Sequence, residues 1–111
     1  MVDVDHRMSL MRDESFGPVV GIMAVDDDEQ AIALMNDSEF GLTASVWTQD
    51  LARGEALARR LQCGVALVNN HAITGILPET PWTGVKDTGS GVTNSRSAPL
   101  QATARYFSTN N

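Results

Sequence analysis

The stretch LTASVWTQDLARGEALARRLQCGVALV, residues 42–68, decides the fold of this chain. It begins with β-branched and aromatic side chains, which predict a strand over residues 42–48. Asp50 then caps a predicted helix that continues through residue 61. A second, short apolar strand is predicted over residues 65–68. Two strands joined by a helix are typical of a parallel sheet with right-handed crossovers.

Two glycines mark the limits of these elements. Gly41 precedes the first strand, and we expect it at positive φ, a backbone conformation that glycine adopts without strain. Gly64 follows the predicted helix, where we expect it to end the last turn. Arg59 and Arg60 lie in that last turn, and their positive charge complements the helix dipole.

The same alternation extends toward the N-terminus. Residues 19–25 form an apolar run bounded by Pro18 and by an acidic stretch, which is typical of a strand buried on both faces. Asp27, with Gln30 three positions later, then predicts a capped helix. The apolar residues expected on one face of this helix are Ala31, Leu34 and Met35. The predicted fold class is therefore α/β, with a βαβαβ unit of the three-layer type built on a parallel sheet.

Composition bounds the classes of protein that fit. A chain of 111 residues with 42% hydrophobic residues is expected to form a single domain over residues 1–111. The net charge of −6 argues against nucleic acid or an anionic membrane as the main partner. Cys63 is the only cysteine, so we expect neither an internal disulfide nor a metal site, and cytoplasmic localisation is the default.

The segment DESFGPVV, residues 13–20, is the candidate binding segment. Pro18 favours extended backbone before it, and on extended backbone Glu14 and Phe16 point to the same side. A carboxylate there can accept hydrogen bonds from sugar hydroxyls, while the neighbouring ring covers a flat heterocycle. The alternative is an exposed acid beside a core phenylalanine. His6 is interpreted as a surface residue, because no nucleophile pattern surrounds it.

The C-terminal third carries a long loop and a tail. The loop follows the predicted strand at residues 65–68 and contains Trp82, which two prolines precede and which either walls an apolar pocket or fills a core. In parallel sheets ligands gather beyond the carboxyl ends of the strands, where Asn69, Asn70 and His71 follow. Residues 92–111 are predicted to be an irregular, poorly ordered tail or an oligomer-contact segment.

Several blocks of this sequence occur together in one known family. They are ESFGPV at residues 14–19, AIALMN at 31–36, FGLTASVWT at 40–48, the Cys-Gly pair at 63–64, and PWTGVK at 81–86. In this order they resemble the C-terminal part of the catalytic domain of NAD(P)-dependent aldehyde dehydrogenases, which oxidise an aldehyde to a carboxylic acid. The resemblance extends from about Val4 to about Gly91.

The resemblance implies roles for individual residues. It implies that Glu14 hydrogen-bonds the nicotinamide ribose of NAD or NADP, and that Phe16 packs beside the nicotinamide. It also implies that the loop over residues 69–82 closes the aldehyde tunnel. The substrate-pocket residues of this loop would be His71, Ile73 and Trp82.

The resemblance also places the family's nucleophilic cysteine, general base and glycine-rich cofactor fold upstream of residue 14, so no catalytic residue is expected in this chain. Cys63 is interpreted as a buried structural thiol at a helix end. The chain alone is expected to be inactive, and to form a homo-oligomer or to associate with a missing N-terminal half. The alternative is a non-catalytic α/β binding or interaction module built on the same scaffold.

Overall fold

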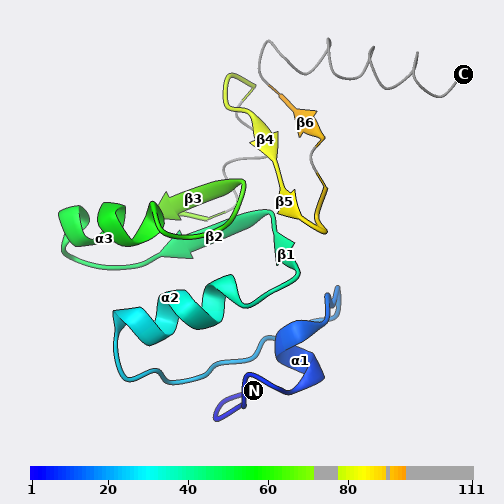
Figure 1. The fold of residues 1–111 in the computed structure, drawn as a ribbon, viewed down its shortest axis with the longest axis vertical. Helices are drawn as coiled ribbons and strands as arrows, with labels where there is room; N and C mark the ends of the chain where they lie inside the picture. The colour runs from blue at the N-terminus through cyan, green and yellow to red at the C-terminus, as the bar shows by residue number, and fades with distance from the viewer. Residues whose placement is uncertain (72–77, 90, 95–111) are drawn as a thin grey trace, which may run out of the picture. The chain divides into compact units, whose positions relative to one another are not determined.

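The computed structural model describes residues 1–71, 78–89 and 91–94. The chain divides into two compact units, Met1–Glu39 and Phe40–Asn111 (Figure 1). Each unit is built around its own short elements.

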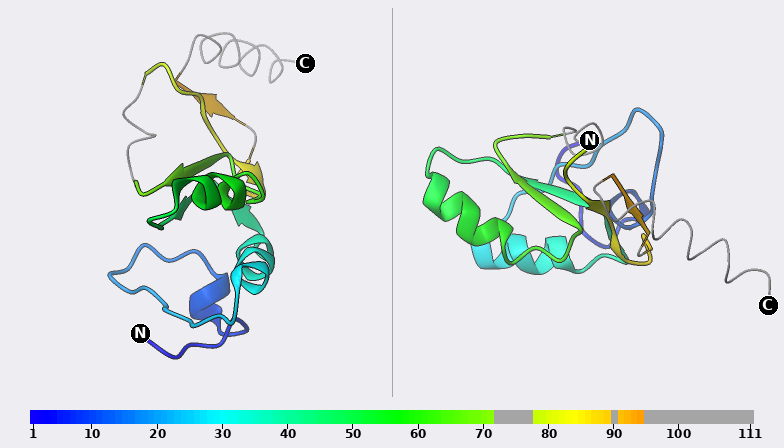
Figure 2. Two further views of the ribbon diagram at one scale, coloured as in Figure 1. Left: turned by 90° about the vertical axis from the view of Figure 1, so that its left-hand side faces the viewer. Right: turned by 90° about the horizontal axis from the view of Figure 1, so that it is seen from above.

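A strand–helix–strand element forms the centre of the second unit. Strands β2 (Thr43–Val46) and β3 (Val65–Val68) pair in parallel, with Thr43 opposite Val65 and Val46 opposite Val68. Helix α3 (Leu51–Ala58) connects them and lies alongside both strands in the two views of Figure 2. The side chain of Asp50 caps α3 by accepting a hydrogen bond from the amide of Arg53 at 3.0 Å. The predicted parallel pair and its capped helix are confirmed.

Two antiparallel pairs complete the described part of the second unit. Strand β1 (Phe40–Gly41) pairs with β5 (Val85–Lys86), and β4 (Trp82–Thr83) pairs with β6 (Val92–Thr93). The sequence predicted a loop and the start of a tail in these places. Strands of two residues carry no hydrophobic period, so only their distant partners define them.

The expectation for Gly41 is wrong. Among the described glycines only Gly89 has positive φ, whereas Gly41 lies within β1. A β-carbon at Gly41 would lie 2.6 Å from the carbonyl oxygen of Gln62 and 2.7 Å from a methyl group of Val85. Glycine is required there because the neighbouring backbone approaches closely.

Two helices define the first unit. They are α1 (Ser9–Arg12) and α2 (Asp28–Asn36). Asp27 caps α2 by accepting a hydrogen bond from the amide of Gln30 at 2.8 Å, as predicted. The side chain of Gln30 returns to the amide of Asp26 instead of that of Asp27, at 2.6 Å. This reciprocal pair satisfies backbone donors that a helix start otherwise leaves free.

The predicted apolar face of α2 is rotated in the structure. Ile32 is the buried residue of this helix, while Met35 is exposed and Ala31 and Leu34 are half-buried. Because Ile32 is one position away from Ala31, the face that packs lies about a quarter turn from the predicted one.

The strand predicted over residues 19–25 is not confirmed. The run makes one isolated parallel bridge, between Val2 and Ile22, and Val20 is 69% exposed. A buried strand needs neighbouring strands on both sides, whereas this run is hydrogen-bonded to Met1 and bridged to Val2 on one side. The complete βαβαβ unit is therefore reduced to the β2–α3–β3 element.

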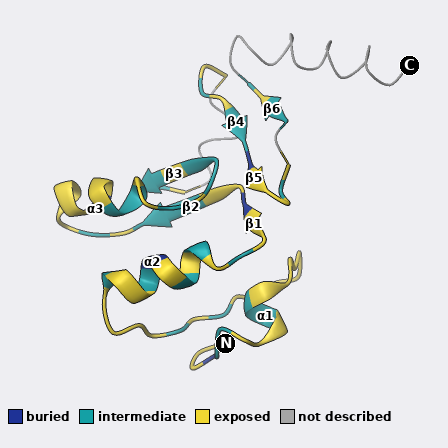
Figure 3. Cartoon of the chain, viewed as in Figure 1, coloured by how far each residue is buried: buried dark blue, intermediate teal, exposed yellow. Residues whose placement is uncertain are grey.

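Few apolar side chains are buried. Among the described residues, Val4 and Ile32 are the buried hydrophobic ones, and most of the ribbon in Figure 3 is exposed or intermediate. Large apolar side chains on the surface include Phe16, Val20, Ile22, Trp47 and Leu51. Within the described ranges, no helix combines the length and the apolar composition that crossing a bilayer requires.

Candidate functional site

The segment over residues 13–18 leaves α1 as an exposed turn. Asp13 ends the helix in extended backbone, with φ −88° and ψ 144°, and its amide donates to the carbonyl of Ser9 at 2.8 Å. Glu14 and Phe16 follow directly, and both are exposed. Phe16 is 96% exposed, so it is not a core residue within this chain. A ring and a carboxylate two positions apart are thus both open to a ligand or to another polypeptide.

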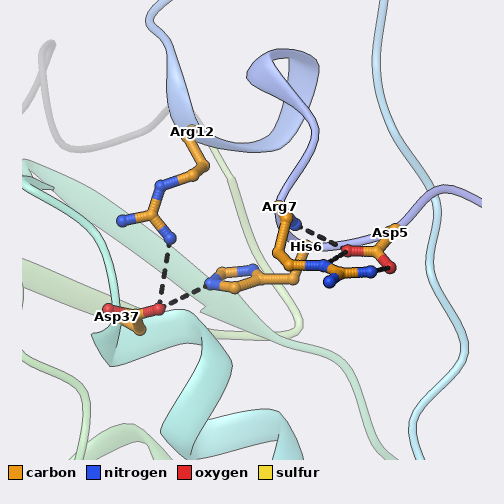
Figure 4. A network of polar contacts seen from close by, with 5 residues as sticks. All are labelled: Asp5, His6, Arg7, Arg12 and Asp37. Atoms are coloured by element: carbon orange, nitrogen blue, oxygen red, sulfur yellow. Dashed lines mark hydrogen bonds and ion pairs between the residues drawn. The ribbon is translucent and has the colours of Figure 1, made fainter.

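A polar network anchors the helix that leads into this turn (Figure 4). One carboxylate oxygen of Asp37, at the end of α2, lies 2.9 Å from Nε2 of His6 and 3.3 Å from Nη1 of Arg12. The pKa of Asp37 lies below its usual value because of the hydrogen bond from His6 and, next, the hydrogen bond from Arg12. The same network contains a second pair, in which Arg7 donates to Asp5 at 2.9 and 3.0 Å.

An open groove runs along this network. It has a volume of about 260 Å³ and is lined by Arg7, Ser9, Arg12, Asp13, Asp37, Ser38 and Glu39. His6 was interpreted as a surface residue; its side chain is partly covered, with 17% exposed, and it is bonded to Asp37. His6 and Asp37 are 31 positions apart, and no local pattern in the sequence signals their contact.

The second unit contains the other predicted residues. Hydrogen bonds join the two chain segments that follow the carboxyl ends of β2 and β3. Asn69 adopts φ 52°, and its side-chain amide exchanges two hydrogen bonds of 2.8 Å with the backbone of Thr48. The ring of His71 lies beside Trp47, with ring centroids 6.3 Å apart. Trp47 is 65% exposed and was not singled out from the sequence. An aromatic pair therefore stands where ligands approach a parallel sheet.

Trp82 lies in β4, whereas His71 follows β3. Its indole Nε1 is buried and has no hydrogen-bond partner among the described residues. Trp82 lines a groove of about 320 Å³ together with Leu42, Thr83, Gly84, Thr88, Gly89, Gly91 and Thr93. Ile73, the third predicted substrate-pocket residue, lies outside the described residues.

Cys63 has the surroundings of a structural thiol. It is half-buried, and its Sγ donates to the carbonyl oxygen of Val65 at 3.3 Å. Partial burial raises the pKa of this thiol, which disfavours the thiolate that nucleophilic attack needs. The Cys63 thiol is thus half-buried instead of buried as predicted, and its role as a structural thiol stays a prediction.

The pairing of Asp5 with Arg7 makes a testable pH prediction. The hydrogen bond from the Arg7 side chain lowers the pKa of Asp5 from 3.8 to about 2. Because the folded value is depressed, the stabilisation is present above pH 3.8 and is lost as the pH falls through about 2. An NMR titration of the Asp5 carboxyl carbon should show this midpoint, and in Arg7→Gln the midpoint should rise toward 3.8. An unchanged midpoint in Arg7→Gln would contradict the assignment.

Comparison with known proteins identifies the class. Residues 1–106 match the model of the aldehyde dehydrogenase family. The chain is 44% identical over 90 residues to the NADP/NAD-dependent aldehyde dehydrogenase PuuC of Escherichia coli, covering 81% of this chain and 18% of that protein. It is 39% identical over 92 residues to a betaine aldehyde dehydrogenase of Brucella melitensis, covering 83% of this chain and 18% of that protein.

Solved structures agree with the sequence matches. A Mycobacterium tuberculosis aldehyde dehydrogenase complexed with NAD+ superposes with a TM-score of 0.81 at 37% identity, covering 87% of this chain and 20% of that one. A betaine aldehyde dehydrogenase of Staphylococcus aureus, also with NAD+, gives a TM-score of 0.82 at 29% identity, covering 87% and 19%. This chain belongs to the aldehyde dehydrogenase family. It spans about a fifth of the length of these relatives.

Proposed function

We propose that this chain is the C-terminal portion of the catalytic domain of an NAD(P)-dependent aldehyde dehydrogenase, which converts an aldehyde to a carboxylic acid. The observation that carries the proposal is the exposed turn after α1, where Phe16 is 96% exposed within a chain of this family. An apolar ring is costly to leave in water, so such exposure favours a surface that a ligand or another part of the enzyme covers.

The residues of this turn fit a nicotinamide dinucleotide. Glu14 is exposed and can accept hydrogen bonds from ribose hydroxyls, and Phe16 offers a free aromatic face for the flat nicotinamide. When bound, NAD or NADP accepts the hydride that leaves the substrate. The two residues of this chain would hold and orient the ring, which matters because small misplacements of reacting groups are costly in rate.

The second unit would supply part of the aldehyde-binding surface. We assign this role to His71, Ile73 and Trp82, and the exposed ring of Trp47 beside His71 supports an aromatic wall there. The substrate would be a small-molecule aldehyde. The nucleophilic thiol, the general base and the glycine-rich cofactor fold are assigned in this proposal to a polypeptide outside these 111 residues.

The exposed apolar side chains favour association of this chain with another polypeptide. Ile22, Val20 and Leu51 are more than half exposed, and surfaces of this kind are usually covered by a partner. The proposed partner is the N-terminal part of the enzyme or a second copy of the chain. The same surfaces also favour the alternative function, a non-catalytic interaction module. The single cysteine supports a reducing compartment, and the cytoplasm is the proposed location.

We expect the purified 111-residue chain to show no aldehyde-dependent reduction of NAD or NADP. Cys63 is a poor nucleophile, because partial burial raises its pKa and its Sγ donates to the carbonyl oxygen of Val65. Absorbance of the reduced dinucleotide at a range of aldehyde concentrations checks this. Activity that Cys63→Ala abolishes would refute both the proposal and the assignment of Cys63.

Complementation separates the two functions. The chain is mixed or co-expressed with the part of the E. coli relative that it does not match, and dinucleotide reduction is followed with a panel of aldehydes. The expected result is activity that needs both polypeptides. A stable complex without any dinucleotide reduction or binding would favour the interaction module instead.

A further inference from the structure

We propose that Asp37 is a positioning residue for the turn that carries Glu14 and Phe16. The proposal rests on the function proposed above for that turn, but the contacts that carry it lie within the first unit. Asp37 itself would touch neither cofactor nor substrate. It would act through His6 and Arg12, which its carboxylate holds from the end of α2 (Figure 4).

Helix α1 cannot hold its own position. It has four residues, its N-cap residue Met8 makes no side-chain capping bond, and none of its residues is buried. Helices this short are unstable in water without tertiary contacts, because nucleation fixes several residues for one hydrogen bond. The direction in which the chain leaves α1 therefore depends on what α1 is attached to.

Asp37 attaches both ends of this helical segment to one point. His6 precedes α1 and Arg12 is its last residue, and both donate to the same Oδ2 atom of Asp37, at 2.9 and 3.3 Å. Helix α2 offers a firmer base, since it has nine residues, a capping bond from Asp27 and the buried side chain of Ile32.

The position of the Asp37 charge also favours a role in holding α1. A carboxylate at the C-terminal end of a helix faces the negative end of the helix dipole, which is unfavourable. Asp37 occupies the C-cap of α2, and the described last turn of α2 contains no basic residue. The charge of Asp37 is thus offset by the Arg12 guanidinium from another segment, so this charge contributes to the attachment of α1 and not to the stability of α2.

The attachment reaches the proposed cofactor residues through few bonds. Asp13 follows Arg12, donates its amide to Ser9 at 2.8 Å and turns the backbone to an extended conformation. Glu14 is the next residue and Phe16 lies two positions further. Releasing Arg12 would therefore let the whole turn swing, whereas Leu10 and Met11, which pack at Gly21, would keep the unit folded.

Hydrogen exchange in the 111-residue chain tests the attachment. In Asp37→Ala, the amides of Met11 and Asp13 should exchange about three- to tenfold faster, as expected for the loss of one or two solvent-exposed charged contacts. The amides of α2 should keep their rates. Asp37→Asn, which retains an acceptor oxygen, should give a smaller effect. Arg7→Gln is the matched control, because it breaks the neighbouring pair with Asp5 and leaves Asp37 untouched.

Three outcomes decide the proposal. Faster exchange confined to residues 9–17 in the Asp37 variants supports it. Unchanged exchange in α1 overturns it, and so does an equal loss of protection across both helices, which would make Asp37 a general stabiliser.

The complemented enzyme then tests the consequence for the cofactor. Asp37→Ala should raise the KM for the dinucleotide about three- to tenfold, in line with the loss of anchoring, with less than about a twofold change in the KM for the aldehyde. An active variant with an unchanged dinucleotide KM would overturn the positioning role and leave the proposed function standing. If the unmutated chain and its complementing polypeptide together never reduced dinucleotide, the proposed function would be refuted. The exchange experiment would still decide whether Asp37 holds α1.

Discussion

Gly64→Ala should unfold the second unit or destabilise the chain by about 3 kcal/mol, the upper range for forcing atoms into packed space. The added β-carbon would overlap the carbonyl oxygen of Thr83 and lie 2.5 Å from its carbonyl carbon. Both atoms belong to backbone, so no side-chain rotation can relieve the overlap. The amide of Gly64 also donates to the carbonyl of Gly41 at 3.0 Å, which holds this residue in place beside β1.

Urea unfolding followed by circular dichroism measures this effect. Gly17→Ala is the matched control, because a β-carbon there would meet only the Ser15 hydroxyl, at an ordinary 3.5 Å. We expect its free energy of unfolding to stay within about 0.5 kcal/mol of that of the parent chain, as for most surface changes. Equal midpoints for the two variants would show that Gly64 and Thr83 are not in the close contact described.

Phe16→Ala should lower the turnover of the complemented enzyme about tenfold to a hundredfold, because a cofactor ring without its packing partner is misplaced for reaction. Glu14→Gln should also lower turnover. Its loss of charge-assisted hydrogen bonds to ribose is worth about 1.5–3 kcal/mol each. Neither change should shift the melting temperature noticeably, since both side chains are exposed within this chain.

Phe16→Tyr is the matched control for the ring, because it retains the aromatic face, and it should keep most of the activity. Stopped-flow measurement of dinucleotide reduction and a thermal scan of each variant provide the two readouts. If Phe16→Ala lowered the melting temperature strongly while the rate stayed unchanged, Phe16 would be a packing residue and the assignment of the cofactor turn would fail.

The local signals of the sequence were sufficient for the elements whose contacts are local. Asp27 and Asp50 cap α2 and α3 as predicted, because an N-cap bond joins residues only three positions apart. The parallel pair of β2 and β3 was also predictable, since an apolar run, a helix and a second apolar run leave few other arrangements. The blocks of residues that resemble the family correctly indicated membership of the aldehyde dehydrogenases.

Pairing over long distances could not be predicted. Phe40 pairs with Lys86, and Arg12 reaches Asp37 across 25 positions. For residues 19–25 the sequence predicted a strand that the structure lacks. Their composition is that of a buried strand, but in the described structure they make one isolated bridge. An apolar run becomes a strand only when neighbouring backbone satisfies its amides and carbonyls.

The amino-acid order was enough to predict the capped helices, the β2–α3–β3 element and the family, and to single out the turn proposed to contact the cofactor. The folded chain was needed to show that His6 and Arg12 share the Asp37 carboxylate, that Gly41 is needed for close packing, and that Phe16 is left uncovered. The difference lies in the range over which the interactions act. Capping bonds and hydrophobic periods act between residues a few positions apart, whereas ion pairs, close backbone approaches and exposure depend on which distant segments the folded chain brings together.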